Sequence, residues 1–475
     1  MVTPTISAEV NLMSEIYDVI IVGAGPAGIF ASLELSRAGL DILLLDKGRE
    51  VNARICPVQK GDKRCVFCSP CHLVSGFGGA GAFSDGKLTL STEVGGHLKE
   101  LVGLEQASTL VDHVDDTYLN FGAPHKVYGV GEQVMELDRQ ATLAGLKLTP
   151  VKLRHMGTEN CRQVLKAMYE YLSSKVDVKL KTVGENIVIE EGAVKAIETS
   201  DGQRFNCRYL ILAPGREGSE WLIKEAEKLK LSLGSNAIDV GCRIEVPMVT
   251  MEKLTSVLYE SKLEFYSKSF DDRLRTFCMC PGGEVIMEST GGSDPVVTVN
   301  GVGYAEHKTK NTNFAILVST AFTEPFHEPI AYGKYLARLA NILSGGILVQ
   351  RLGDLMDGRR STQARLQRSI VEPSLKAATP GDLSFALPFR YLKGIVEMLQ
   401  AMDKLVPGVA SPHTLLYGTE VKFYSSHLKL TPHLETEVKN IFAVGDGAGV
   451  SRGLVQASAS GIIAAREILK RLNRN

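Results

Sequence analysis

Three glycines near the start of the chain have the spacing of a phosphate-binding turn. Gly23, Gly25 and Gly28 follow the apolar run YDVIIVG and precede a segment with apolar side chains at helical spacing. Glycines at this spacing permit a tight turn, a close approach of the backbone to a pyrophosphate, and close packing of a helix on a strand. Asp46 lies about 20 residues further on, at the end of a second apolar run, where a carboxylate accepts hydrogen bonds from ribose hydroxyls. The pattern predicts a dinucleotide site on a strand–turn–helix–strand unit.

A second glycine-rich segment, GFGGAGAFSDGK, occupies residues 76–87. Its glycines leave backbone N–H groups free to meet an anion closely. Ser84, Asp85 and Lys87 are candidate polar contacts to the same ligand. The alternative is a surface loop that packs on the edge of a sheet and binds nothing.

Four of the nine cysteines, Cys56, Cys65, Cys68 and Cys71, fall within one short stretch. The spacing C-x₂-C-x₂-C with a distant Cys-Pro is typical of the ligands of a [4Fe–4S] cluster. Four thiolates also suit structural zinc, a C-x₂-C pair suits redox thiols, and the cysteines could also be unliganded. Cys71 lies within about 18 Å of the glycine-rich segment by chain length, which favours a redox role.

Other candidate site residues are spread along the chain. Cys278 and Cys280 are expected to point apart and to be poor joint ligands; Cys280 is a candidate for the wall of a substrate cavity, and the alternative is that both are core residues. His427 and His433 are candidates for acid–base work, because an imidazole titrates near neutral pH. Guanidinium groups that could clamp a carboxylate or phosphate, or form surface ion pairs, belong to Arg243, Arg359 and Arg360.

These residues must be positioned by an α/β fold. Residues 17–47 read as strand, turn, helix and strand, residues 161–175 as a helix, and RYLILAPG as another buried strand after an antiparallel meander. Residues 236–405 read as an inserted mixed domain, and NIFAVGDGAG at 440–449 returns to the strand–turn pattern. The expected organisation is one discontinuous domain, residues 1–235 and 406–475, with a substrate domain over residues 236–405.

Composition excludes several classes of protein. The chain has 475 residues, 44% of them hydrophobic and 23% charged, with a net charge of −1, which is ordinary globular composition. A near-neutral chain has no overall field to collect nucleic acid. Neither a signal peptide nor an apolar stretch long enough to span a membrane is apparent, and an odd number of cysteines argues against a secreted disulfide framework. We therefore expect a cytoplasmic protein without a nucleic-acid partner.

Three segments resemble the signatures of the glutathione-reductase-type FAD fold. They are IYDVIIVGAGPAGIFASLELSRAGLDILLLDKG, RYLILAPGREG and LETEVKNIFAVGDGAG, in that order along the chain. The resemblance implies that Gly445 and Asp446 contact the ribityl chain of FAD, and that the helix starting near Gly453 points at the flavin ring. The full set of FAD contacts that we expect is Gly23, Gly25, Pro26, Ala27, Gly28, Asp46, Lys47, Gly79, Ala80, Gly81, Phe83, Ser84, Lys87, Val183, Ala213, Gly215, Gly445, Asp446, Gly453, Leu454 and Val455.

A narrower resemblance covers most of the chain. GFGGAGAFSDGKL, DVGCRIEVP, CMCPGGEV and GRRST are similar to segments of a bacterial and archaeal group called FAD-dependent dehydrogenases, or NAD(P)/FAD-dependent oxidoreductases. The group implies FAD as cofactor but does not name a substrate.

The resemblance implies an oxidoreductase that passes hydride or electrons between FAD and a small organic substrate, which could be isoprenoid-like. The alternative is an electron-transfer protein in which a cysteine-held [4Fe–4S] cluster exchanges electrons with FAD and a ferredoxin-like partner. Flavin-dependent RNA modification and a non-catalytic binding protein are less favoured. NAD(P)H could bind beside FAD, although no second strand–GxGxxG–helix unit is present to form a domain for it.

Overall fold

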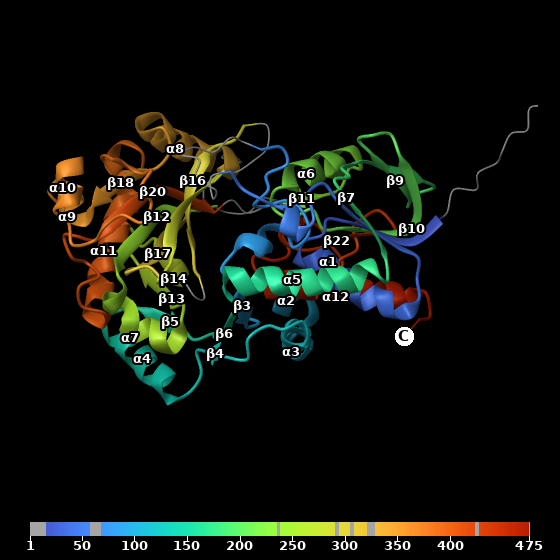
Figure 1. Ribbon diagram of the computed structural model, residues 1–475, viewed down its shortest axis with the longest axis horizontal. Helices are drawn as coiled ribbons and strands as arrows, with labels where there is room; N and C mark the ends of the chain where they lie inside the picture. Colours follow the sequence, from blue (N-terminus) through green and yellow to red (C-terminus); the bar gives the residue numbers. More distant parts are fainter. Residues whose placement is uncertain are drawn as a thin grey trace, which may run out of the picture.

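The apolar runs of the sequence form the parallel centre of a seven-stranded sheet in the first of two units (Figure 1). The computed structural model describes residues 16–57, 68–234, 238–289, 294–304, 308–320, 328–422 and 427–474. In this sheet β1 pairs in parallel with β2 and β10, β2 pairs with β7, and β10 pairs with β22. An antiparallel meander, β8–β9–β10, extends the sheet at one side. The strands are β1 (Ile16–Val22), β2 (Ile42–Asp46), β7 (Asp177–Leu180), β8 (Gly184–Glu190), β9 (Ala193–Thr199), β10 (Arg204–Leu212) and β22 (Ile441–Ala443).

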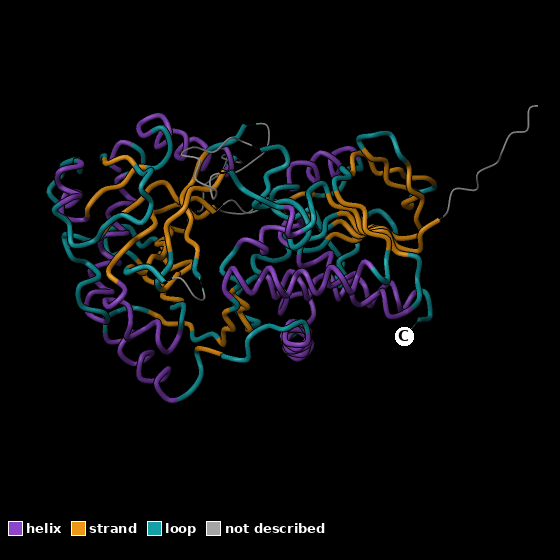
Figure 2. Tube along the Cα trace, viewed as in Figure 1, coloured by secondary structure: helices purple, strands orange, loops and turns teal. Residues whose placement is uncertain are grey.

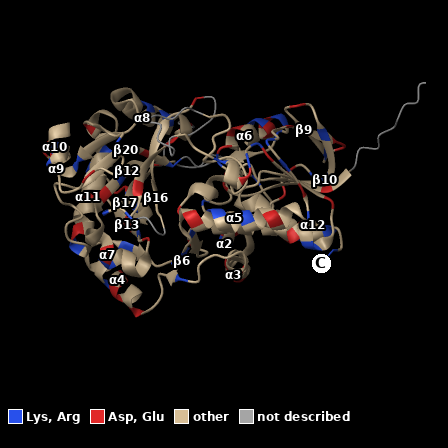
Figure 3. Ribbon diagram, viewed as in Figure 1, with Lys and Arg blue, Asp and Glu red and all other residues tan. Residues whose placement is uncertain are grey.

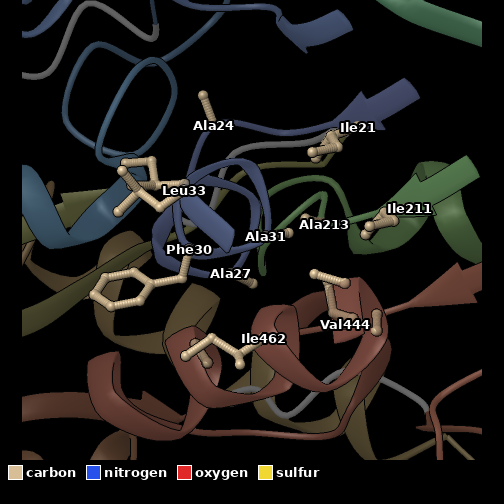
Figure 4. Packing of buried hydrophobic residues seen from close by; sticks show 14 of the residues in the cluster. Ile21, Ala24, Ala27, Phe30, Ala31, Leu33, Ile211, Ala213, Val444 and Ile462 are labelled. Carbon is tan, nitrogen blue, oxygen red and sulfur yellow. The ribbon is translucent and has the colours of Figure 1, made fainter. Parts of the chain in front are cut away.

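Helices cover this sheet and place two helix starts beside each other. Helix α1 packs against α12, and α12 packs against α3. Figure 4 shows Ala27, Phe30 and Ala31 of α1 next to Ile462 of α12. The helices of this unit are α1 (Pro26–Leu35), α2 (Leu98–Val102), α3 (Leu104–Asn120), α5 (Gly157–Ser173), α6 (Ser219–Lys228) and α12 (Leu454–Arg471), with the 3₁₀ turns η1 (Ser36–Ala38), η2 (Val51–Ala53), η4 (Gly79–Phe83) and η6 (Asp446–Ala448).

The second unit is built on an eight-stranded, mostly antiparallel sheet with the order β19–β18–β20–β12–β17–β14–β13–β5. Figure 2 shows most of its helices at the outer side, while its strands lie toward the first unit. The strands are β5 (Lys147–Thr149), β12 (Ile238–Pro247), β13 (Lys262–Tyr266), β14 (Arg273–Pro281), β17 (Asn311–Thr320), β18 (Leu348–Arg351), β19 (Thr379–Pro380) and β20 (Leu415–Lys422), with a hairpin of β15 (Glu284–Ser289) and β16 (Val297–Val302). The helices are α4 (Glu132–Leu143), α7 (Met248–Leu258), α8 (Pro329–Ser344), α9 (Leu352–Met356), α10 (Gln363–Gln367) and α11 (Phe389–Leu405), with the 3₁₀ turn η5 (Leu383–Phe385).

Small sheets join the units. Strands β3 (Lys87–Leu90), β6 (Lys152–His155) and β4 (Val127–Tyr128) form a three-stranded sheet that lies between them (Figure 1). Strands β11 (Leu233–Gly234) and β21 (His427–Leu428) form a two-stranded one. Strand β3 follows the glycine-rich turn η4, so residues from that loop are carried directly toward the second unit.

The chain crosses between the two units more often than the sequence pattern indicated. The expected first domain resumed at residue 406, but β20 pairs with β12 and β18 in the sheet of the second unit. Helix α4 and strand β5, which precede residue 236, also pack in the second hydrophobic core. Local periodicity identifies these segments as helix or strand but carries no information about which sheet they join.

Charges of both signs are interspersed over both units (Figure 3). Among the helices that the structure describes, none is long and apolar enough to cross a lipid bilayer.

Candidate functional site

Two of the three fingerprint glycines, Gly23 and Gly28, are placed where any side chain would collide with the backbone. Gly23 has φ +110°, and a Cβ on it would lie 2.0 Å from the carbonyl oxygen of Ala213. A Cβ on Gly28 would lie 1.9 Å from the carbonyl oxygen of Gly23. Helix α1 begins directly after Gly25 with no side-chain cap and no acidic residue in its first turn. The start of α1 is therefore available to an anion such as a pyrophosphate.

Asp46 holds the two backbone segments beside the helix start. Its Oδ2 accepts a hydrogen bond from Ala24 N at 2.8 Å, and its Oδ1 accepts one from Gly48 N at 2.7 Å. Each carboxylate oxygen can accept a further hydrogen bond, which leaves capacity for ribose hydroxyls.

The glycine-rich segment lies against the starts of both α1 and α12. Gly78 N donates to the carbonyl oxygen of Ala24 at 2.8 Å. A Cβ on Gly79 would lie 3.1 Å from the Cα of Gly25, and one on Gly81 would lie 2.8 Å from Cδ2 of Leu454. The absence of side chains at these glycines lets the segment pack closely on both helix starts. Residues 76–87 therefore lie beside the dinucleotide fingerprint, as expected for a loop that contacts the cofactor.

The two later signatures meet at the same place. Ala213 N donates to the carbonyl oxygen of Val22 at 2.8 Å, and a Cβ on Gly447 would lie 2.5 Å from the carbonyl oxygen of Gly215. Asp446 accepts a hydrogen bond from Ser451 Oγ at 2.6 Å, and burial raises the pKa of its carboxyl. Fingerprint, glycine-rich loop and third signature thus surround one path, and the residues present along it fit FAD.

The other residues that we expected to contact FAD differ in their burial and in their contacts. Lys47 forms an ion pair with Glu217. Val183 is 41% exposed and follows Thr182, whose N–H donates to the carbonyl oxygen of Asp46 at 3.0 Å. Phe83 is buried and carries the guanidinium of Arg162 4.6 Å from its ring centre. Pro26 and Ala27 are the first residues of α1. Gly453 caps α12, and Leu454 and Val455 are its first residues. Ala80 is exposed in η4, and Ser84 Oγ donates to the carbonyl oxygen of Gly81 at 2.9 Å.

Lys87 leaves the glycine-rich loop and enters a buried ionic cluster of the second unit. Its Nζ lies 2.9 Å from Asp85 Oδ2 and 3.1 Å from Glu260 Oε2, and it donates to the carbonyl oxygen of Met279. Burial opposes the charge, but Asp85, two cysteine sulfurs and Glu260 outweigh it and raise the pKa of Lys87 well above its usual value. Burial likewise acts against ionisation of Glu260, yet Lys262 and Lys87 lower its pKa to about 2. Lys87 and Glu260 are therefore both charged at neutral pH.

Cys278 and Cys280 both face this ammonium, so the expectation that they point apart is wrong. Their Sγ atoms lie 3.9 and 3.8 Å from Lys87 Nζ. Side chains two residues apart share a face of a regular strand, and here the register of β14 also shifts between Phe277 and Cys280, where Cys278 has φ +46°. Cys280 is fully buried.

Tyr259 and His155 form a buried pair beside the cluster. The Tyr259 hydroxyl lies 2.6 Å from Nε2 of His155, and the two rings stack with centres 4.1 Å apart. Burial lowers the pKa of His155 to about 4, so the imidazole is neutral at pH 7. Burial also raises the pKa of Tyr259 above its usual value. A neutral imidazole accepts a hydrogen bond from the hydroxyl at Nε2 or donates one to its oxygen, according to the tautomer.

Arg243 is not available as a clamp for substrate. Its guanidinium is fully buried and forms two hydrogen bonds to Glu420, at 2.8 and 2.7 Å. Its other N–H groups donate to the carbonyl oxygen of Cys278 and to Asn313 and Asn300. Arg243 therefore has a structural role, because it links β12 to β20, to β14 and to β16 next to the Lys87 cluster.

The remaining candidates lie apart from the cluster. His427 is exposed in β21, where a Cβ on its neighbour Gly234 would meet its ring. His433 is also exposed, and its Nδ1 lies 3.8 Å from Glu467, well over 10 Å along α12 from the helix start. Arg359 pairs with Asp354 and Asp357, and Arg360 is exposed. Acid–base roles for the two histidines stay predictions.

The predicted metal site is only partly described. Cys65 lies outside the described residues, and Cys56, Cys68 and Cys71 are half-buried. In the part of the chain that the structure describes, no three His, Cys, Asp or Glu side chains gather as metal ligands. The residues that flank the cysteine-rich segment are in contact, because His72 Nδ1 lies 2.6 Å from the carbonyl oxygen of Ile55. The metal site stays a prediction.

Sequence reasoning missed His155, Tyr259, Glu260 and Gln456. Gln456 of α12 accepts a hydrogen bond from Leu98 N at 3.1 Å and donates to the carbonyl oxygen of Val94 at 3.1 Å. None of these residues belongs to a local motif, and each acquires its role through contacts with a distant segment.

Family models match both units. Residues 16–54 match the model described as FAD binding domain, and residues 237–423 match the one described as FAD-dependent protein, C-terminal domain-like. The second match agrees with the placement of β20 in the second unit.

Proteins and solved structures that are similar to the chain include the following three. A Clostridium beijerinckii protein described as uncharacterized is 28% identical over 481 residues, covering 96% of this chain and 81% of that protein. Digeranylgeranylglycerophospholipid reductase of Methanosarcina mazei is 37% identical over 54 residues, covering 11% of this chain and 13% of that protein. The 3-ketosteroid-delta4-(5alpha)-dehydrogenase of Rhodococcus jostii RHA1 superposes with a TM-score of 0.44 at 14% identity, covering 97% of this chain and 99% of that chain.

The two family matches agree with the geometry of the fingerprint and of the later signatures. The chain is an FAD-dependent protein with a Rossmann-like FAD-binding domain and a second, mixed α/β domain.

Proposed function

We propose that the chain oxidises or reduces a small organic substrate held between the glycine-rich loop and the second unit, next to Lys87. Bound FAD supplies two-electron chemistry. The chain positions the substrate, keeps water away and moves the accompanying proton.

One observation carries this proposal. Lys87 follows the loop that packs on the FAD fingerprint, and its ammonium is bound by groups from β14 and from Glu260 of the second unit. A buried, ionised cluster built from both units at this point is where a polar group of a substrate would be oriented beside the cofactor.

Tyr259 and His155 are the groups that we assign to proton movement. The phenol donates its proton to the substrate during reduction, and the neutral imidazole, with its proton on Nε2, donates a hydrogen bond to the phenol oxygen at 2.6 Å and stabilises the phenolate. Water returns a proton to the phenolate. Asp85 and Glu260 hold Lys87 in place as a fixed positive charge.

The test is anaerobic reduction of the FAD-loaded chain followed by rapid mixing with candidate acceptors that contain activated C=C, C=O or C=N bonds. We expect at least one class to reoxidise the protein. Tyr259→Phe should slow that step about 100-fold without changing FAD affinity, while Tyr335→Phe, at a side chain 62% exposed, should leave the rate unchanged. Reoxidation by one-electron acceptors alone would contradict the proposal and favour electron transfer.

An isoprenoid-like substrate stays a prediction. The stretch shared with Digeranylgeranylglycerophospholipid reductase covers 54 residues, or 11% of this chain, which is too short to span both units. Polyprenyl acceptors in the same mixing experiment test it.

The iron–sulfur cluster and its ferredoxin-like partner also stay predictions, since they rest on cysteine spacing. Iron and zinc analysis of anaerobically purified protein, with absorbance near ~400 nm before and after chelation, decides between cluster, zinc and unliganded cysteines. Participation of NAD(P)H is tested by adding it anaerobically and following flavin bleaching.

A further inference from the structure

Cys278 and Cys280 form a thiol pair that the proposed reaction does not use. Both sulfurs lie within 4 Å of Lys87 Nζ, and Cys280 Sγ also lies 3.6 Å from Asp85 Oδ2. Cys278 is half-buried, whereas Cys280 is fully buried. Residue 278 as a whole thus keeps some contact with solvent, whereas residue 280 has none.

The backbone of β14 is built around this pair. The register with β17 is regular up to Phe277 and resumes at Cys280, which leaves Cys278 outside the ladder. A β-bulge at this position redirects the side chains of the strand, so both sulfurs lie near the ammonium of Lys87. Arg243 secures it by donating to the carbonyl oxygen of Cys278 at 2.7 Å.

The charges around Cys278 favour its thiolate. The largest contribution is a hydrogen bond from Cys280, which favours the thiolate, whereas burial disfavours it. The positive charges of Lys87 and Arg243 attract the thiolate, and the negative charge of Asp85 repels it. Together these effects lower the pKa of Cys278 to about 6. The charges of Lys87 and Arg243 are themselves balanced by Glu260 and Glu420. The pKa of Cys280 is raised well above its usual value, in first place by the hydrogen bond to Cys278.

We propose that Cys278 and Cys280 are a dithiol–disulfide site that exchanges two electrons with low-molecular-weight disulfides, with Cys278 as the attacking thiolate and Cys280 as the resolving thiol. The thiolate of Cys278 attacks one sulfur of the external disulfide, a mixed disulfide forms, and one external thiolate leaves. Cys280 then gives its proton to Asp85 and attacks the sulfur of Cys278. The internal disulfide forms and the second external thiolate leaves, so the two electrons lost by the protein thiols reside on the two released thiolates, and Asp85 passes the proton to water.

The site goes beyond the flavin reaction and does not depend on it. The first test is alkylation of the full-length, FAD-loaded chain by iodoacetamide between pH 5 and pH 9, with peptide mass spectrometry. We expect Cys278 to react at least about tenfold faster at pH 7 than Cys161, Cys207 and Cys242, whose thiol pKa values burial raises. Its rate should follow a midpoint near 6, and a midpoint near ~8.5, the ordinary value, would overturn the assignment.

The second test uses oxidised glutathione. The peptide containing both cysteines should lose two hydrogen atoms, and dithiothreitol should restore them. Cys280→Ser should stop at a glutathione adduct on Cys278, while Cys278→Ser should form no adduct at Cys280. Cys242→Ser, on β12 of the same sheet, is the matched control and should behave as the wild type. A stable adduct on Cys278 in the wild type, with no internal disulfide, would overturn the proposal, and the wild-type measurements stand even where a variant fails to fold.

Discussion

Asp46 holds two backbone segments with one carboxylate, and we propose that the same carboxylate binds the ribose of FAD. Its two oxygens receive backbone N–H groups from the turn before α1 and from the residue after β2. Each oxygen keeps the capacity to accept a further hydrogen bond. A residue of this kind is recognised from the sequence because the motif itself fixes its neighbours.

Removing that carboxylate weakens both roles. Asp46→Ala leaves two buried N–H groups without their acceptor, which costs about 1–3 kcal/mol each, and we expect FAD affinity to fall at least tenfold. Fluorescence titration of FAD measures the change. Asp41→Asn, at an exposed position just before the same strand, is the control; equal effects of the two substitutions would contradict the role of Asp46.

His155 gives the folded protein a pH dependence. Its pKa is lowered from 6.5 to about 4 by burial, so the folded state favours the neutral ring. This contribution is fully present above pH 6.5 and is lost as pH falls from 6.5 toward 4.

We therefore expect the free energy of unfolding to fall between pH 7 and pH 5 by about 2 kcal/mol more in the wild type than in His155→Gln. Urea unfolding of the FAD-saturated proteins at both pH values measures the difference. The same pH dependence in both proteins would show that His155 is not the group responsible.

At the scale of elements, the contact between α1 and α12 determines where the phosphate-binding helix start lies. A Cβ on Gly461 of α12 would lie 2.0 Å from the carbonyl oxygen of Ala27. The two helices touch at backbone level, close to the turn that the fingerprint forms.

Gly461→Val should force the helices apart. We expect a loss of about 1–3 kcal/mol in the free energy of unfolding from overpacking, together with weaker FAD binding because α1 moves. Lys470→Ala, at an exposed position of the same helix, should change neither quantity. Unaltered FAD affinity in a folded Gly461→Val protein would show that the helix contact does not position the site.

Elements whose role is local were predictable from the sequence, and elements whose role depends on distant contacts were not. The unit β1–α1–β2 follows from apolar periodicity and its glycines, and the third signature follows from a local motif before α12. The exchange of β5 and β20 into the second sheet, and the bulge at Cys278, depend on pairing with strands far away in sequence. The Tyr259–His155 pair joins residues from two units, which no local pattern can indicate.

At the scale of the whole molecule, a buried ion pair stabilises the sheet of the second unit, which contacts Lys87. Arg243 and Glu420 are both fully buried and join β12 to β20. Taking away one partner leaves a buried charge that is incompletely paired, which is far more costly than losing a surface pair.

Arg243→Met should therefore lower the free energy of unfolding by about 3 kcal/mol, and Arg243→Met with Glu420→Gln should recover part of that loss. Denaturant midpoints of the FAD-saturated proteins give both values. Arg139→Ala, which removes an exposed pair with Glu136, should cost less than about 1 kcal/mol. A loss in Arg243→Met no larger than in Arg139→Ala would contradict the structural role of the pair.

The central claim is that FAD lies along the path from Gly25 to Asp446. A crystal structure of the full chain grown with FAD tests it most directly. We expect density for the pyrophosphate at the start of α1, between Gly25 and Gly79, with the ribityl chain beside Asp446. Density for FAD elsewhere on the chain, or an empty path in crystals saturated with FAD, would contradict it.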